Sequence, residues 1–242
     1  MTLGGNGTKM MKKHIVLAIC AAMAGDPSVA QSADHPTVIE LYTSQGCSSC
    51  PPADALLAQI ATRSDVIALA LHVDYWDYIG WTDTFGDPAF AKRQRAYART
   101  MGEKMVYTPQ MIINGTTAIV GSDAAALSAA LAPAGGGNAP VLHLSRAGET
   151  LSIRAKAAPG LVAPVVVKLV RYRPQSDVSI GEGENGGRTI TYTNIVTGWT
   201  DIGQWDGSNA LKLDVDAAGK QAVVVLLQEA GPGRIVAAAE AN

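Results

Sequence analysis

Two cysteines three residues apart, Cys47 and Cys50, are the side chains best suited to chemistry in this chain of 242 residues. A C-x-x-C pair can close a small disulfide, and it can also hold a metal ion. Residues 36–42 before the pair alternate in the manner of a strand, and residues 51–61 after it carry apolar residues at helical spacing. A C-x-x-C pair at a strand-to-helix junction indicates a thiol–disulfide site.

We expect the sulfur of Cys47 to face solvent at the start of the helix that begins near Cys50. Unpaired backbone N–H groups and the helix dipole favour an anion there, which raises the thiolate fraction of the first thiol. Cys50 would then resolve the mixed disulfides that Cys47 forms. Two alternatives stay open. One is a passive structural disulfide, although so small a loop adds little stability in chain-entropy terms. The other is copper binding by the two cysteines with His72.

A second signal is the dipeptide Thr108-Pro109, which directly precedes the apolar run at 110–113. In an α/β architecture of this kind, we expect the loop before that strand to come close to the disulfide. A cis peptide bond before Pro109 would expose backbone with which an extended substrate could pair, and Thr108 would line the same substrate site.

Further candidates lie on the neighbouring strands. His72 and Asp74 end an apolar strand, where sites in α/β proteins tend to lie, so we expect them to support the cysteines; a hydrogen-bonded interior histidine is the alternative. Tyr75 and Trp76 belong to an aromatic segment that either lines the substrate site or forms a small core under a long loop. Glu40 has apolar neighbours, so it is suited to buried proton transfer, or else it is an exposed strand residue.

The first 30 residues are expected to be a leader. Lys9, Lys12 and Lys13 form a basic region, an apolar region follows at 14–25, and small residues up to Ala30 offer a cleavage site. Cleavage there would leave two cysteines in an exported chain, periplasmic or secreted, where disulfides persist.

The rest of the chain divides in composition at a Pro- and Gly-rich stretch, and we place a linker at 135–140. In the half at 31–134, strands and helices alternate as β-α-β-α-β-β-α, which predicts an α/β unit followed by a hairpin. These elements are expected at 38–42, 51–63, 66–73, 88–101, 111–113, 117–120 and 124–131.

The half at 141–242 has a different pattern, with short strand candidates separated by turn residues. They lie at 141–146, 150–156, 164–172, 188–195, 211–215, 222–228 and 234–238. Evenly spaced short strands predict a mostly antiparallel, β-sandwich-like domain.

The half at 31–134 resembles the thioredoxin superfamily. Cys47 and Cys50 match its redox pair, Pro109 matches its cis-proline, and Glu40 resembles the buried acid that some members use for proton transfer. The tryptophan that usually precedes the first cysteine is Gly46 here, and Ser-Ser replaces Gly-Pro between the cysteines. The resemblance implies a thioredoxin-like domain.

A closer resemblance covers nearly the whole chain after the leader. Residues 40–54, 72–77 and 183–188 are similar to signatures of an uncharacterised secreted thioredoxin-like family, catalogued as a domain of unknown function. This resemblance implies a fold and a family, but it implies no substrate.

Composition excludes several other classes of function. The net charge is only −2, so no nucleic-acid surface is expected. After the leader, no apolar run is long enough to span a bilayer. We expect no cofactor and no resident metal. The favoured function is a thiol–disulfide oxidoreductase acting on a protein or a small thiol or disulfide; a non-catalytic binding module and a copper chaperone are the alternatives.

Overall fold

The computed structural model describes residues 1–5, 34–131, 139–219 and 221–241. The elements of the first half follow one another in the predicted order, with one added 3₁₀ helix. They are β1 (Thr37–Thr43), α1 (Pro51–Ile60), β2 (Val66–His72), the 3₁₀ helix η1 (Asp77–Ile79), α2 (Pro88–Met101), β3 (Gln110–Ile113), β4 (Thr117–Val120) and α3 (Ala124–Ala130).

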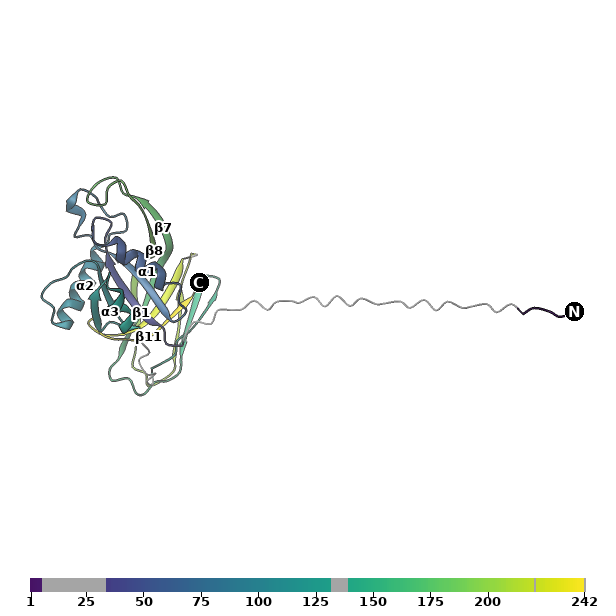
Figure 1. The fold of residues 1–242 in the computed structure, drawn as a ribbon. Coiled ribbons are helices and arrows are strands. Elements are labelled where there is room, and N and C mark those ends of the chain that lie inside the picture. The colour runs from purple at the N-terminus through teal and green to yellow at the C-terminus, as the bar shows by residue number, and fades with distance from the viewer. Residues whose placement is uncertain (6–33, 132–138, 220, 242) are drawn as a thin grey trace. The chain divides into compact units, whose positions relative to one another are not determined.

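In the first half, β1 is the central strand. It runs parallel to β2, from Thr37↔Val66 to Thr43↔His72, and antiparallel to β3, which continues into the hairpin with β4. Side chains alternate across β1. Ile39 and Leu41 pack in the cluster that contains residues of α1 and α3, whereas Val38 and Tyr42 pack in the cluster that contains residues of α2. The helices therefore cover opposite faces of the sheet (Figure 1).

The second half contributes strands only. They are β5 (His143–Ala147), β6 (Thr150–Ala155), β7 (Val165–Ser179), β8 (Thr189–Trp205), β9 (Leu211–Asp216), β10 (Ala222–Glu229) and β11 (Ile235–Ala241).

The strands of the second half do not form a sheet apart from the first. Four of them extend it, so that one mixed sheet has the order β11-β10-β7-β8-β2-β1-β3-β4. This differs from the expected separate β-sandwich-like domain. The physical reason is that β10 is buried on both faces, and its two sets of side chains belong to two different clusters.

The other three strands form a second antiparallel sheet, in the order β5-β6-β9. Its apolar side chains, such as Leu151 and Ile153, pack in one cluster with Val165 and Val167 of β7 and with residues of β10. The sandwich-like packing predicted for this half therefore exists, between the small sheet and part of the large one.

Strands β7 and β8 are much longer than the sequence predicts. The expected ends were at 172 and 195, but β7 continues to Ser179, which pairs with Thr189, and β8 continues to Trp205, which pairs with Val165. Pro174 lacks an N–H group, so it cannot donate to the ladder. It lies across from Asn194, whose φ is +50°, between the pairs Arg173↔Ile195 and Gln175↔Thr193. The resulting hairpin carries the loop at 180–188 toward the cysteines.

Two expectations fall largely outside the described residues. The leader at 1–30 overlaps the undescribed range 6–33, and the linker at 135–140 overlaps 132–138. No helix in the described part of the chain is long and apolar enough to cross a membrane.

Candidate functional site

The cysteine pair forms a disulfide at the start of α1. The Cα atoms of Cys47 and Cys50 are 5.4 Å apart, and Cys50 is the N-cap residue of the helix. Pro51 and Pro52 follow in the first turn, where the missing N–H groups cost no helical hydrogen bond. This arrangement agrees with the predicted strand-to-helix junction.

The polar side chains of Thr108, Trp76 and Ser49 surround Sγ of Cys47. The Thr108 hydroxyl donates to Sγ of Cys47 at 3.3 Å, and it accepts a 2.7 Å hydrogen bond from the indole N–H of Trp76. Oγ of Ser49 lies 3.4 Å from the same sulfur. The Thr108-Pro109 peptide bond is cis. The structure therefore brings together Cys47, Thr108, Pro109 and Trp76, as expected from the sequence.

Solvent exposure of the sulfur was predicted wrongly. Cys47 is only 1% exposed and Cys50 is fully buried. The reason is packing that the sequence does not reveal: Trp76 lies against Gly46, where an added Cβ would come within 3.2 Å of Cβ of Trp76. Since a side chain at 46 would meet the tryptophan, glycine permits this close cover.

The hairpin loop at 180–188 braces the cysteine loop from the second half of the chain. The side-chain amide of Asn185 donates two 2.9 Å hydrogen bonds, to the backbone carbonyls of Gln45 and Cys47. Arg188 donates in turn to Oδ1 of Asn185 at 2.9 Å. Asn185 is 1% exposed, so these bonds are made in the interior. In the sequence, residues 183–188 stood out only as a signature of the family resemblance, with no link to the cysteines.

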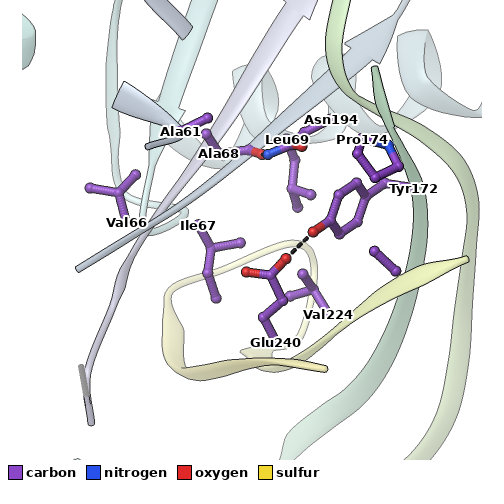
Figure 2. Close-up of a pocket in the computed structure, with 11 residues that line it drawn as sticks. Ala61, Val66, Ile67, Ala68, Leu69, Tyr172, Pro174, Asn194, Val224 and Glu240 are labelled. Carbon is purple, nitrogen blue, oxygen red and sulfur yellow. Dashed lines mark hydrogen bonds between the residues drawn. The ribbon is translucent and has the colours of Figure 1, made fainter. Parts of the chain in front are cut away.

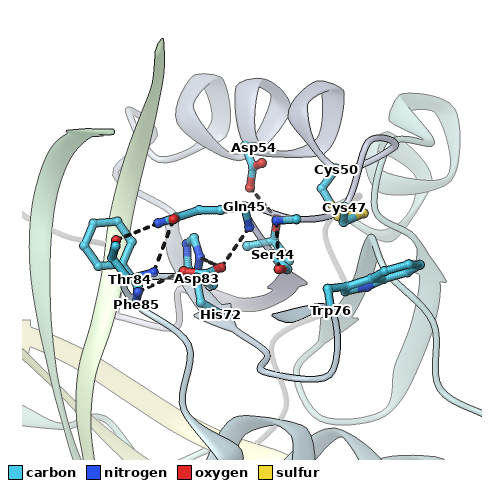
Figure 3. A network of polar contacts seen from close by, with 12 residues as sticks. Ser44, Gln45, Cys47, Cys50, Asp54, His72, Trp76, Asp83, Thr84 and Phe85 are labelled. Atoms are coloured by element: carbon cyan, nitrogen blue, oxygen red, sulfur yellow. Dashed lines mark hydrogen bonds and ion pairs between the residues drawn. A yellow bond between two sulfur atoms is a disulfide. The ribbon is translucent and has the colours of Figure 1, made fainter. Parts of the chain in front are cut away.

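A buried polar network lies beside the disulfide (Figure 3). Nδ1 of His72 lies 2.8 Å from Oδ2 of Asp83, and both side chains are fully buried. The same carboxylate accepts from the backbone N–H of Gln45 at 2.8 Å. Burial opposes the charge of Asp83, but His72 and these hydrogen bonds lower its pKa. His72 is therefore the hydrogen-bonded interior histidine of the alternative interpretation, and it is linked through Asp83 to Gln45 of the cysteine loop.

Asp54 is an acidic residue of the site that the sequence analysis missed. It lies four residues after Cys50 on α1 and is almost wholly buried, with one carboxylate oxygen accepting a 2.8 Å hydrogen bond from Thr43. Burial raises the pKa of Asp54 to about 7, although His72 and Thr43 act in the opposite direction. The available signal was its position on the apolar stripe of the helix, beside Ala53 and Leu57.

Glu40 lies elsewhere than expected. It is fully buried, so the exposed alternative is wrong, but its carboxylate binds Arg93 at 2.7 and 2.9 Å and accepts a 2.6 Å hydrogen bond from Tyr97. Both partners belong to α2, on the face of the sheet opposite α1. The strand alternation that buries Glu40 also turns it away from the helix that carries Cys50. Its partners make it a structural ion pair.

The remaining expected residues have different surroundings. The Tyr75 hydroxyl donates to Gln94 at 3.1 Å, and Gln94 donates to the carbonyl of Tyr107, so Tyr75 supports the loop before Pro109 indirectly. Burial raises the pKa of Tyr75 to about 12. Asp74 accepts a hydrogen bond from the Asp77 N–H through its backbone carbonyl, and within the described residues its side chain has no recorded bond to the cysteines.

The described residues offer no ligand set for the alternative of copper binding by Cys47, Cys50 and His72. In the described ranges, no three His, Cys, Asp or Glu side chains are grouped as metal ligands would be. The ring nitrogen Nδ1 of His72 is already held by Asp83.

Fold and site together define a mixed α/β protein with a C-x-x-C disulfide at the start of a helix. The family model described as "Protein of unknown function (DUF1223)" matches residues 38–228. The chain therefore belongs to the DUF1223 family. Among curated proteins, no significant match is found. The chain is similar to the solved structure of protein AGR_C_4864 from Agrobacterium tumefaciens, with a TM-score of 0.75 and 32% identity over 87% of this chain and 94% of that one.

Proposed function

We propose that this protein is a thiol–disulfide oxidoreductase with a thioredoxin-like first half, and that Cys47 and Cys50 are its redox pair. The observation that carries the proposal is the contact of the Thr108 hydroxyl with Sγ of Cys47, at 3.3 Å. A passive disulfide has no need of a hydrogen-bond donor aimed at one of its sulfurs.

Trp76 supports this role by orienting the hydroxyl. The indole N–H can only donate, so Thr108 must accept from it, which leaves the hydroxyl hydrogen free to point at the sulfur. Once the disulfide is reduced, the same hydrogen would bond to the Cys47 thiolate. A hydrogen bond to the charged form stabilises that form, as does the nearby start of α1.

The reaction then follows in two steps. The Cys47 thiolate attacks one sulfur of a partner's disulfide, and the partner's other sulfur leaves as a thiolate, which takes a proton from water. Cys50 loses its proton to water and attacks the Cys47 sulfur. The Cys47–Cys50 bond forms, and the partner's second sulfur leaves. Two electrons pass from the cysteine pair to the partner; the reverse sequence oxidises a dithiol.

Cys47 is too little exposed for a partner sulfur to reach it directly. In exchange the attacking, attacked and leaving sulfurs must lie in line, so the cysteine site has to open first. We propose that the partner displaces Trp76. Its neighbour Tyr78 is 81% exposed and stacks on it, with ring centroids 6.5 Å apart and planes at 14°. The pair offers an aromatic surface beside the cysteines to an extended segment of a partner protein.

The second candidate function is a non-catalytic binding module, and the 1% exposure of Cys47 favours it. A buried disulfide can brace such a module without reacting. This protein would then bind a partner equally well after both cysteines are replaced by serine.

Reduction of insulin by a dithiol reductant separates the two functions. The wild-type protein should accelerate precipitation of the insulin chains, whereas Cys47→Ser should not. Cys50→Ser should accumulate a mixed disulfide through Cys47. Equal rates for the wild type and Cys47→Ser would exclude this mechanism and leave the bracing disulfide.

We also propose that the protein acts outside the cytoplasm. Support comes from the sequence alone, where the basic, apolar and small-residue regions of a leader follow one another before residue 31. Mass determination of the N-terminus of the exported protein tests this proposal; an intact residue 1 would contradict cleavage after Ala30.

A further inference from the structure

The large sheet is incomplete where the two halves of the chain meet. Strand β2 pairs with β1 over its whole length, but with β8 only through Ala70↔Ile195. Asn194 departs from β geometry just before that pair, and its Nδ2 donates a 2.9 Å hydrogen bond to the carbonyl of Ala68. Before Ala70, no strand in the described part of the chain pairs with β2 on the β8 side.

A cavity of about 470 Å³ lies at this edge (Figure 2). Val66, Ile67, Ala68 and Leu69 of β2 form one side of it. The other lining residues come from β7, β8, β10 and β11 and from the end of α1, and they are Tyr172, Pro174, Asn194, Ala222, Val224, Glu240 and Ala61. The volume suits a small organic molecule, and most of these side chains are aliphatic. The cavity shares no residue with the cysteine site.

One acidic group in this lining has no charged counterpart. Glu240 accepts a hydrogen bond from the hydroxyl of Tyr172, which is itself 4% exposed. Within the described chain, Glu240 forms no ion pair with a Lys, Arg or His side chain. Burial alone raises its pKa. Leaving a partly buried carboxylate without a cation is unfavourable, so a cationic ligand would relieve the cost.

The lining offers a second acceptor, the side-chain amide oxygen of Asn194. Asn194 uses its amide nitrogen on Ala68, and its amide oxygen accepts no recorded hydrogen bond in the described residues. A ligand that donates hydrogen bonds would satisfy both this oxygen and Glu240. An anion or a pure acceptor would meet repulsion from Glu240.

We propose that the cavity between β2, β7, β10 and β11 binds an organic cation, a primary ammonium on an aliphatic body, with Glu240 as the counter-ion. The ammonium lies at Glu240 and the oxygen of Asn194, and the aliphatic body lies along Val66–Leu69 and Val224. This site is independent of the proposed redox function.

Hexylamine is the probe, and 1-hexanol and hexanoate are its neutral and anionic counterparts. Each is titrated into the full-length protein, and amide chemical shifts are followed by NMR. Hexylamine should bind saturably and shift the Asn194 side-chain amide and the amides of Ala68 and Leu69. Glu240→Gln keeps the shape of the side chain but removes the charge, so it should weaken hexylamine binding by about tenfold or more.

Controls make each outcome decisive. Glu149→Gln, an exposed substitution in the turn between β5 and β6, should bind hexylamine like the wild type. An unchanged fingerprint spectrum of Glu240→Gln away from the cavity shows that the variant is folded. Equal hexylamine affinity of Glu240→Gln and wild type, equal binding of hexanoate, shifts located elsewhere, or no saturable binding would each overturn the proposal.

Discussion

The indole N–H of Trp76 donates a 2.7 Å hydrogen bond to the hydroxyl of Thr108, and that hydroxyl donates to Sγ of Cys47 at 3.3 Å. Three residues from three loops are thus joined in one chain of donors that ends on a sulfur. The same tryptophan packs against Gly46, the residue directly before Cys47.

Thr108→Val should slow the reaction of Cys47 in the reduced protein. The substitution keeps the shape of the side chain but removes the donor. A hydrogen bond to a charged group contributes about 1.5–3 kcal/mol, so the thiolate fraction at neutral pH should fall by roughly tenfold or more. The measurement is the rate of Cys47 alkylation by iodoacetamide as a function of pH.

The matched control is Thr117→Val, at an exposed position on β4. It should leave the alkylation profile of the wild type unchanged. A profile of Thr108→Val that superimposes on the wild-type profile would show that the hydroxyl does not stabilise the thiolate.

Asn185→Ala should loosen the cysteine loop, although the residue lies in the other half of the chain. The change removes both donors to the carbonyls of Gln45 and Cys47, at a cost of about 1–3 kcal/mol in the free energy of unfolding. The Cys47–Cys50 bond should also be reduced faster by dithiothreitol, because the loop can expose its sulfur more easily. Asn209→Ala, on the exposed loop after β8, should change neither quantity; a wild-type reduction rate in Asn185→Ala would contradict the bracing role.

Asp54 should give the free energy of unfolding a specific pH dependence. Burial raises its pKa from 3.8 to about 7, so in that interval the folded protein holds a proton that the unfolded chain has released. This contribution to stability is therefore lost as the pH rises, by at most about 1.4 kcal/mol per pH unit, and the loss is complete above the folded pKa.

Asp54→Asn removes this titration and keeps an acceptor for Thr43. Relative to the wild type, the variant should therefore gain stability as the pH rises from about 4 to about 7. Urea unfolding at several pH values measures the difference. Exposed Glu103→Gln serves as the control and should run parallel to the wild type; a parallel curve for Asp54→Asn would exclude the raised pKa.

Arg93→Met should destabilise the fold strongly, because it leaves Glu40 buried without its cation. Glu40 is fully buried and the Arg93 side chain is 11% exposed. Breaking such a pair costs about 3–5 kcal/mol. The pair of Arg63 and Asp65 has the same 2.7 Å distance, yet Arg63→Met should lower the free energy of unfolding far less, because both side chains are exposed and solvent screens their attraction. Equal losses in chemical unfolding would contradict a structural role for Glu40.

The sequence predicted helices and turns whose ends are set by capping and turn residues close by in the chain. Helix α2 begins and ends where Asp87, Pro88 and Gly102 indicate, because the cap, the first-turn proline and the left-handed glycine act within a few residues. The hairpin at Asn114-Gly115 is local in the same way.

The site depended on information that a local pattern lacks. Alternation along β1 predicts that Glu40 and Leu41 face opposite ways, but it does not say which face α1 covers, so it could not tell whether Glu40 faces the cysteines. Asn185 lies 138 residues from Cys47 in sequence, and no periodicity joins them. The burial of Cys47 is likewise tertiary, since Thr108, which lies against its sulfur, is 61 residues away in sequence.

The reduction potential of the Cys47–Cys50 bond in the native protein tests the central claim most directly. The protein is equilibrated with mixtures of reduced and oxidised glutathione, free thiols are trapped, and the fractions are counted by mass spectrometry. We predict a potential above about −300 mV, with reduction far faster than global unfolding. A potential well below that value, or reduction only as fast as the protein unfolds, would contradict the account and make the disulfide a structural brace.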